Sequence, residues 1–372
     1  MTPPPPPLSP HPDVVSLGPA RDQLWSAVHQ GDERGAAAVV LDALESSADA
    51  EAVLLDLIAP VQARVGMEWA ANRLTVAQEH TATAIHERVI AVLAHRPGPR
   101  DEAPSGPRVT VACVDGEWHA LPARLLAEVL RLRGWRVDFL GAHVPTPHLI
   151  AHLHQTGPRA VALSSSIPTH LPTAHTAITA CQAAGVPVIA GGAAFGPEGR
   201  YARALGADGW APDARGAAEV LERGLDRPVS PSLHQTVDDL PHLADQEYTI
   251  VAGTTHQLVK QTLADLEDRF EPLRGYTERQ RRHTAEDLAH IVEYLATSLY
   301  VADEELFTRF ILWTADILTA RRVPARSLDP ALDLLALQLK DFPRACRTLA
   351  HAREALGNRT PPSTIPGPGK PE

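Results

Sequence analysis

The chain has 372 residues, and at roughly 150 residues per domain this length predicts two or three domains. Its 44% hydrophobic and 21% charged residues are typical of soluble proteins, and no stretch reaches the roughly 20 apolar residues of a membrane span. The 34 basic and 45 acidic residues leave a net charge of −11, which argues against direct binding to nucleic acid. The three cysteines show no CxxC spacing, so we expect neither disulfides nor a zinc site, and a cytoplasmic location.

Proline-rich stretches mark the ends of the chain and the expected joints between domains. Residues 1–19 and 358–372 predict disordered tails, and MTPPPPPLSPHP lacks the basic and apolar regions of a signal peptide. Residues 20–96 carry apolar side chains at helical spacing and predict a helical-bundle cap domain. Residues 97–107 are charged and proline-rich, as expected of a linker.

Residues 108–228 predict a domain of alternating strands and helices. Short apolar runs, typical of buried strands, alternate with helical segments: strands near 109–114, 137–140, 160–164, 186–190 and 209, and helices near 121–133, 145–156 and 172–185. This alternation indicates a doubly wound parallel sheet of the Rossmann or flavodoxin-like kind. Ligands of such sheets bind at the carboxyl ends of the strands, so the loops that follow the strands are the expected site.

The remainder of the chain predicts a linker and a second helical domain. Residues 229–244 form the expected linker, and residues 245–357 the expected all-α domain. Its apolar spacing predicts helices at about 247–270, 277–300, 303–321, 328–341 and 343–356.

The loop after the first expected strand contains a histidine close to a carboxylate. It reads Asp115-Gly116-Glu117-Trp118-His119 and is followed by Ala-Leu-Pro. A neutral imidazole binds transition metals well, and a neighbouring carboxylate fixes its tautomer. From spacing alone, His119 is either a metal ligand or an ordinary polar loop residue.

Glu117-x-His119-x-x-Pro122 resembles the Asp-x-His-x-x-Gly motif of cobalamin-binding domains. The resemblance implies that His119 replaces the dimethylbenzimidazole tail as the lower axial ligand of cobalt, with Glu117 and Trp118 also at the cofactor. Glu117 keeps the carboxylate of the motif on a longer side chain, whereas Pro122 departs from the glycine.

Two later segments resemble the same family, in the expected order. Ser164, Ser165 and Ser166 stand where these domains have the stretch that lines the nucleotide-tail pocket. Gly191 and Gly192 stand where they have a Gly-Gly turn beside that tail. Because glycine lacks a Cβ atom, it lets the backbone lie close to a flat ligand.

The expected cap contains Trp69 and, ten residues later, the pair Glu79-His80. Thr75 and Gln78 have capping-box spacing and predict a helix that begins near Val76. These residues are either a core tryptophan with a solvated acidic turn, or a converging site. The spacing resembles the Trp-x9-Glu-His signature of adenosylcobalamin photoreceptors.

That resemblance implies that Trp69 covers the 5′-deoxyadenosyl group, that Glu79 hydrogen-bonds its ribose and that His80 supports the site. In the light-sensing repressors of this class, a cap histidine becomes the second axial ligand after photolysis. Ala70 follows Trp69 here, so this chain either lacks that light state or forms it with another residue. Only a proline-rich arm precedes the cap, which also argues against direct binding to nucleic acid.

Residues 281–295, 303–310 and Trp313 resemble a globin-related helical sensor module. A cap, a cobalamin domain and such a module together resemble the photocobilins, which hold cobalamin and biliverdin close together. The resemblance implies an apolar bilin slot with aromatic or imidazole contacts and arginines for the propionates. The candidates are Arg281, Arg282, Arg321, His283, His290, Tyr294, Phe307, Phe310 and Trp313. Each could equally be a core or surface residue, and haem ligated by His283 or His290 is the rival ligand.

We therefore expect a photoreceptor rather than an enzyme, binding adenosylcobalamin and biliverdin. Cleavage of the cobalt–carbon bond by light would change the domain arrangement or a homo-oligomer, and the signal would pass to an unidentified protein. One alternative is a corrinoid carrier that supplies methyl groups to a partner methyltransferase. Trp69 argues against this because a transferable methyl group needs an open upper face. A third possibility is a binding module without photochemistry.

Overall fold

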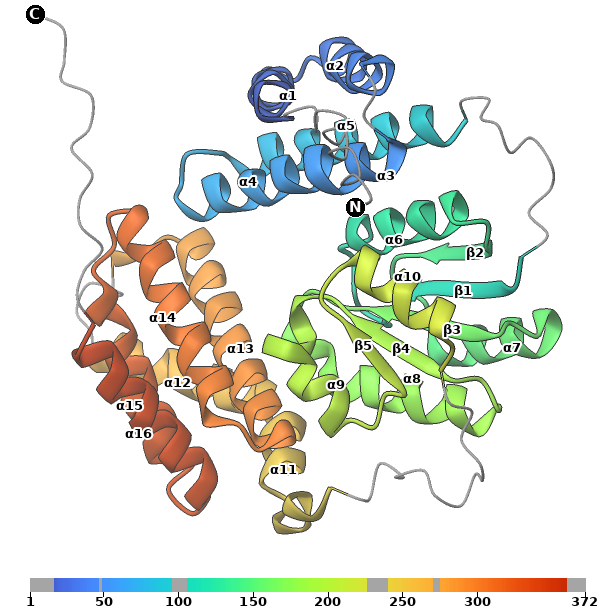
Figure 1. The fold of residues 1–372 in the computed structure, drawn as a ribbon. Coiled ribbons are helices and arrows are strands. Elements are labelled where there is room, and N and C mark those ends of the chain that lie inside the picture. The colour runs from blue at the N-terminus through green and yellow to red at the C-terminus, as the bar shows by residue number, and fades with distance from the viewer. Residues whose placement is uncertain (1–16, 47–48, 96–105, 226–239, 270–274, 360–372) are drawn as a thin grey trace, which may run out of the picture.

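The computed structural model describes residues 17–46, 49–95, 106–225, 240–269 and 275–359. Most of the expected tails and linkers lie outside these ranges. Figure 1 shows a helical cap above an α/β domain, with a group of C-terminal helices beside them, so the expected multidomain α and α/β fold is confirmed. None of the helices within these ranges combines the length and apolar composition that crossing a membrane requires.

Helices α1–α5 and a π-helical segment form the cap. Their bounds are α1 (Gly18–Gln30), α2 (Glu33–Glu45), α3 (Ala50–Ala52), the π-helical segment (Val53–Ile58), α4 (Ala59–Ala70) and α5 (Val76–Ala94). Helix α5 begins at Val76, as predicted: the Gln78 N–H donates to Thr75 Oγ1 at 3.2 Å, and the Thr75 N–H donates to Gln78 Oε1 at 2.9 Å.

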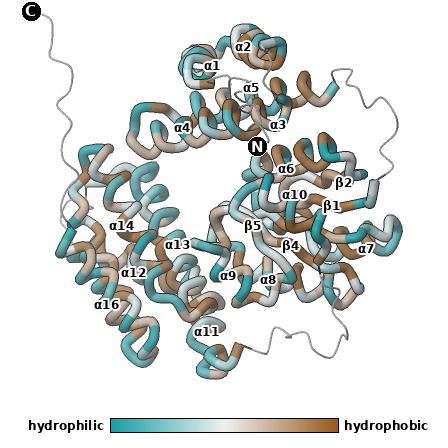
Figure 2. Tube along the Cα trace, in the orientation of Figure 1, coloured by the Kyte–Doolittle hydropathy of each residue, from teal (hydrophilic) through white to brown (hydrophobic). Residues whose placement is uncertain are grey.

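The second domain is a five-stranded parallel sheet in the order β2-β1-β3-β4-β5. Its elements are β1 (Arg108–Cys113), α6 (Leu121–Leu132), β2 (Arg136–Gly141), α7 (Thr146–Thr156), β3 (Ala160–Ser164), α8 (Leu171–Ala183), β4 (Val188–Gly191), α9 (Arg200–Ala204), β5 (Gly209–Ala211) and α10 (Ala214–Arg223). The chain reverses its direction of winding between β1 and β3, where doubly wound sheets bind ligands. The most hydrophobic segments gather in this sheet and in the helices that cover it (Figure 2).

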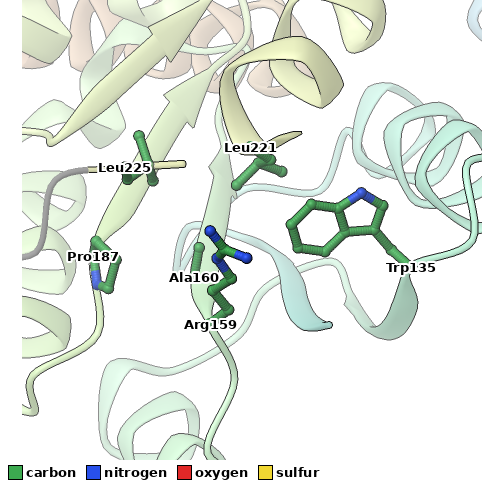
Figure 3. A pocket seen from close by; sticks show the side chains of 6 residues that line it. All are labelled: Trp135, Arg159, Ala160, Pro187, Leu221 and Leu225. Atoms are coloured by element: carbon green, nitrogen blue, oxygen red, sulfur yellow. The ribbon is translucent and has the colours of Figure 1, made fainter. Parts of the chain in front are cut away.

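The register of the sheet brings three loops together at one edge. Cys113 at the end of β1 pairs with Ser164 at the end of β3, and Ser164 pairs with Gly191 at the end of β4. The loops after these strands carry His119, the serine triplet and the glycine pair. At the opposite, amino-terminal edge there is a separate hollow of about 390 Å³, which Figure 3 shows between Trp135, Arg159 and Leu221.

The C-terminal part is helical, as predicted, with one difference. Its helices are α11 (Glu247–Gly253), α12 (Thr255–Arg269), α13 (Glu278–Val301), α14 (Glu304–Ala320), α15 (Asp329–Gln338) and α16 (Pro343–Gly357). The single helix expected from 247 is divided at Thr254. The hydroxyl groups of Thr254 and Thr255 donate to backbone carbonyls three or four residues earlier, directly after Gly253, and both features weaken a continuous helix.

The cap and the C-terminal helices pack on opposite faces of the sheet. One hydrophobic core joins the cap to β1, α6 and α10. Another joins α8 and the other face of the sheet to Tyr300 and Leu306 of the C-terminal part, which also has a core of its own. Both helical parts therefore pack on the α/β domain through shared hydrophobic cores. These two cores set where the cap and the C-terminal helices lie relative to the carboxyl ends of the strands.

Candidate functional site

His119 lies in the loop between β1 and α6, and Glu117 holds it by one side of its ring. His119 Nδ1 is 2.6 Å from Glu117 Oε1, and the same oxygen accepts the His119 backbone N–H at 2.8 Å. Glu117 is fully buried, whereas 61% of the His119 side chain is exposed. Within the described part of the chain, Nε2 has no hydrogen-bond partner, so it is the ring nitrogen available to a metal.

The second oxygen of Glu117 is held by the loop after β3. Glu117 Oε2 accepts the N–H groups of Ser166 at 2.6 Å and Ile167 at 3.1 Å, and the Ser165 hydroxyl at 3.2 Å. Burial alone would raise the pKa of Glu117, but the hydrogen bonds from His119, Ser166 and Ile167 lower it to about 2. Glu117 is therefore a carboxylate at neutral pH, and its hydrogen bond raises the pKa of His119.

A hollow of about 740 Å³ lies between the cap and the carboxyl ends of the strands. Its walls come from both domains: Leu55, Ala59, Gln62, Ala63, Glu79, His80, Thr83, Ala84 and Glu87 of the cap, and Trp118, His119, Ala120, Leu121, Pro122, Leu125, Ser166, Asp213 and Ala214 of the α/β domain. The structure thus brings Glu79 and His80 to the same cavity as His119. The charge of Glu79 contributes to the raised pKa of His119, which places the two groups within electrostatic range.

A second hollow, of about 110 Å³, runs from the first into the sheet. Ser164, Gly191 and Gly192 line it, and Pro122, Asp213 and Ala214 line both hollows. Gly192 has φ +99°, and a Cβ atom there would lie 2.3 Å from the Ser165 carbonyl oxygen, so only glycine fits. Of the three serines that the sequence predicts to line a nucleotide-tail pocket, Ser164 lines this second hollow, while Ser165 and Ser166 bind Glu117.

Sequence reasoning missed a chain of hydrogen bonds in the cap wall. It runs from His80 Nδ1 to Glu79 at 2.5 Å, from Thr83 to Glu79 at 3.0 Å, from Gln62 to Thr83 at 2.8 Å, and from His86 Nδ1 to Gln62 at 2.6 Å. The spacing of Glu79 and Thr83 along one helix could have revealed part of it. Gln62 and His86 meet only because α4 packs on α5, which no local pattern indicates.

Trp118 lies at the rim of the larger hollow with 71% of its surface exposed. Its ring stacks on His143, with centroids 4.8 Å apart and planes at 9°. His143 has φ +50° and its Nδ1 accepts the Gly116 N–H at 2.9 Å. The role of His143 in supporting Trp118 was not predicted, because the two residues are brought together by neighbouring strands.

Trp69 does not belong to the residues that line the larger hollow. It lies at the end of α4, where its ring centroid is 6.5 Å from that of Trp313, and the Arg321 guanidinium lies 5.7 Å from it. Gln62, which does line the hollow, lies seven residues earlier on the same face of α4. Trp69 therefore extends the cavity-facing side of α4 toward the C-terminal helices.

The candidate bilin residues fall into two groups. Tyr294 stacks on Phe310 at 3.7 Å and 7°, and Phe310 lies 6.3 Å from Trp313, which is 46% exposed. Burial raises the pKa of Tyr294 to about 12, and the charges of Glu293 and Glu117 contribute. His290, one turn before Tyr294, is exposed on the same face of α13.

Arg282 and His283 lie farther toward the start of α13. His283 is exposed, with Nδ1 3.0 Å from Glu286. Arg282 lies beside a different hollow, of about 440 Å³, together with Tyr276 and Arg281. At 1.5 Å rise per residue, Arg282 is about 18 Å from Tyr294 along the helix axis. The expected bilin residues are therefore not all gathered at one cavity, and Phe307 is a fully buried core residue.

Comparison with known proteins identifies two regions of the chain. Residues 107–219 match a family model described as a B12 binding domain, and residues 20–94 match a second model with the same description. The HTH-type transcriptional repressor CarA of Myxococcus xanthus is 33% identical over 178 residues, which is 46% of this chain and 57% of that protein. CarH of the same organism is 32% identical over 145 residues, or 37% of this chain and 46% of that protein. The chain spans about half the length of these curated relatives.

Solved structures that match part of the chain include the monomethylamine corrinoid protein of Methanosarcina barkeri. It is 19% identical with a TM-score of 0.47 and covers 56% of this chain and 99% of its own. A cobalamin-binding protein from Desulfitobacterium hafniense is 22% identical with a TM-score of 0.30, covering 54% of this chain and 96% of its own. The helices from Glu247 onward lie beyond both ranges that match the family models.

Proposed function

We propose that the chain, in which two regions match B12 binding domain models, is a photoreceptor that binds adenosylcobalamin and responds to loss of the adenosyl group. The observation that carries the proposal is the Glu117–His119 pair, which leaves an uncommitted Nε2 atom in the hollow between cap and sheet. The light response itself rests on the Trp-x9-Glu-His spacing of the cap.

The residues present fit a cobalamin. A corrin ring suits the larger hollow, which has an imidazole at its base, and the narrower hollow between Ser164 and the glycine pair suits the nucleotide tail. Glu117 keeps the Nδ1 proton of His119 in place, so that Nε2 is the neutral ligand atom. When bound, adenosylcobalamin supplies a weak cobalt–carbon bond that absorbed light can break.

The cap residues have separate proposed roles. Glu79 accepts a hydrogen bond from the ribose, His80 fixes the Glu79 carboxylate through the 2.5 Å contact, and Trp69 shields the upper side of the ligand from the rim. Loss of the upper group removes contacts that favour one arrangement of the cap, which shifts the population of domain or oligomer states. The signal passes to a partner protein, and the chain acts in the cytoplasm as a sensor rather than as an enzyme.

We also propose biliverdin as a second chromophore, on the face of α13 that carries His290 and Tyr294, with Trp313 of α14 beside it. The stacked rings of Tyr294 and Phe310 and the contribution of the Glu117 charge to the raised pKa of Tyr294 support this proposal. The net charge of −11 supports the proposal that the chain itself does not bind nucleic acid.

One observation favours a corrinoid methyl carrier as the second candidate. Trp69 contacts Trp313 and Arg321 and does not line the larger hollow, and an uncovered upper side is what a methyl carrier needs. The two functions differ in what they do with an adenosyl group. A carrier exchanges methyl groups with a donor in the dark, whereas a photoreceptor holds adenosylcobalamin stably until it is illuminated.

The test is an absorption spectrum of protein loaded in the dark with adenosylcobalamin and biliverdin, taken before and after brief green illumination. A photoreceptor shows an irreversible change of the cobalamin bands and a red bilin band. Protein loaded with hydroxocobalamin is the control and should not change. Bound adenosylcobalamin whose bands stay constant under light, combined with a response to methyl donors, would support the carrier instead.

A further inference from the structure

The contact between the cap and the C-terminal helices is centred on one side chain. Trp69 lies 6.5 Å from Trp313, at an interplanar angle of 38°, and the Arg321 guanidinium lies 5.7 Å from its ring centroid. Both distances are within the range of attractive aromatic and cation–π pairs. Trp313 remains 46% exposed, although large aromatic side chains are usually buried when they serve only the core of their own domain.

The cap is attached to the α/β domain at the other end of the same helical stretch. Glu51 of α3 binds Arg133 at 2.9 Å, and Asp56 of the π-helical segment binds Arg215 at 2.6 Å. Asp56 and Trp69 are 13 residues apart, or about 20 Å along the helix. The helical stretch from α3 to α4 is thus bound to the α/β domain near Glu51 and Asp56, and Trp69 lies at its opposite end.

The C-terminal helices are attached firmly to the α/β domain on their own side. Tyr300 is buried and its hydroxyl lies 2.8 Å from His175 Nδ1, while Asp303 binds the Tyr201 hydroxyl and, at 3.0 Å, Arg200. These contacts fix the ends of α13 and α14. Trp313 therefore lies on α14, and Arg321 directly after it, in a part of the chain that is anchored to the α/β domain near Tyr300 and Asp303.

Arg321, which directly follows α14, also lies near a charged group on α13. Burial raises the pKa of Asp287, while the charges of His290, Arg321 and His283 lower it, so these side chains share one electrostatic environment although Asp287 retains exposed surface. The Arg321 guanidinium thus lies over the Trp69 ring and within electrostatic range of Asp287.

We infer that Trp313 and Arg321 are positioning residues that hold Trp69 at the end of α4, on the helix face that lines the larger hollow farther along. By holding it there, the C-terminal helices increase the preference of the site for a cobalamin with a bulky upper group. The inference rests on the proposed binding of adenosylcobalamin above His119. It gives a role at the cobalamin site to the C-terminal helices, which lie outside the two regions that match the B12 binding domain models.

The inference is tested by the ratio of the Kd values for hydroxocobalamin and adenosylcobalamin, measured in the dark on the full chain. Loss of one aromatic or cation–π contact of about 1 kcal/mol corresponds to a roughly fivefold change. We expect Trp69→Ala, Trp313→Ala and Arg321→Gln each to lower the ratio by about fivefold. The double variant Trp69→Ala/Trp313→Ala should be no worse than Trp69→Ala, because both changes remove the same contact.

Two variants serve as controls. Arg309→Gln removes an exposed arginine of α14 that pairs with Glu305, and Leu337→Ala removes an exposed apolar side chain of α15. Both should leave the ratio unchanged. In the unloaded protein, Trp69→Phe and Trp313→Phe should remove the same tryptophan-pair signal from the near-ultraviolet circular dichroism spectrum, which checks the contact without cofactor.

The outcomes separate the inference from the function on which it rests. If the wild-type ratio is close to one, the proposed adenosylcobalamin function fails. If the wild type prefers adenosylcobalamin and Trp69→Ala removes that preference, but Trp313→Ala and Arg321→Gln do not, the positioning role is overturned. Additive losses in the double variant would overturn it as well.

Discussion

The ligand edge of the sheet and the face of α13 that is proposed for the bilin are built in different ways. At the sheet edge, Glu117 and His119 lie two residues apart, and a fully buried carboxylate holds the imidazole. On α13, His283, His290 and Tyr294 are spread over three turns, and the two histidines are exposed. The first arrangement fixes the position of His119 Nε2, whereas the second spreads its side chains along an exposed face of α13. We expect substitutions at the first to have large, specific effects and substitutions at the second to have small ones.

The largest effect is expected from His119→Ala. Because the side chain is largely exposed and Glu117 keeps its hydrogen bonds from the His119, Ser166 and Ile167 backbone N–H groups, the protein should fold normally, while cobalamin affinity falls by at least about 100-fold. Affinity and the cobalt-ligand absorption bands are the measurements. His148→Ala, which removes an exposed histidine of α7, is the matched control. Unchanged cobalt-ligand absorption bands in His119→Ala would contradict the proposal that the sheet edge supplies the cobalt ligand.

His86 of the cap should make the free energy of unfolding depend on pH. His86 is fully buried, its Nε2 has no partner, and burial lowers its pKa from 6.5 to about 4. The unfolded chain therefore takes up a proton at a higher pH than the folded protein does. Stability should be fully present above pH 6.5 and fall by about 3 kcal/mol as the pH drops to 4.

Urea unfolding of wild type and His86→Leu at several pH values measures this dependence. Between pH 6.5 and 4, the unfolding free energy of the variant should no longer show the fall caused by His86. The variant is expected to be less stable at every pH because Gln62 loses its partner His86. Equal slopes for the two proteins would show that His86 does not titrate as its burial implies.

The second hollow, proposed for the nucleotide tail, should also be sensitive to the addition of a single methyl group at Gly192. Gly192→Ala places a Cβ atom 2.3 Å from a backbone oxygen at φ +99°, which should cost about 1–3 kcal/mol of stability and weaken cobalamin binding. Gly185→Ala is the control, because Gly185 has φ +77° but no atom within 4 Å of the added Cβ. Thermal unfolding and cobalamin titration of both variants would show whether close packing or backbone strain dominates. Equal losses would assign the effect to strain alone.

The smallest effects should occur on α13. Tyr294→Leu removes the ring stacked on Phe310 and should weaken biliverdin binding by about fivefold. Arg282→Ala should change it by less than about twofold, because Arg282 lies at a different hollow. Biliverdin titration monitored in the red band measures both. A larger loss for Arg282→Ala than for Tyr294→Leu would place the bilin near the start of α13.

This contrast also explains how much the sequence reveals. The loop after β1 and the turn at Gly192 were predictable because a few adjacent residues and a parallel register determine their geometry. The start of α5 at Val76 was predictable for the same reason, since the Thr75–Gln78 box is local. The hydrogen bond between Gln62 and His86, the stacking of Trp118 on His143 and the contact between Trp69 and Trp313 were not. They join residues 24 or more positions apart, and only the packing of whole elements brings them together.

The most direct test of the central claim is the electron paramagnetic resonance spectrum of the protein loaded with cobalt(II) cobalamin. In this state the lower axial nitrogen splits the cobalt lines, into three for nitrogen-14 and into two for nitrogen-15. Protein grown with nitrogen-15 histidine should give doublets, and the His119→Ala variant should lose this splitting. Triplets that persist in the labelled wild-type protein would show that the cofactor's own base, not His119, is the ligand, and would contradict the account.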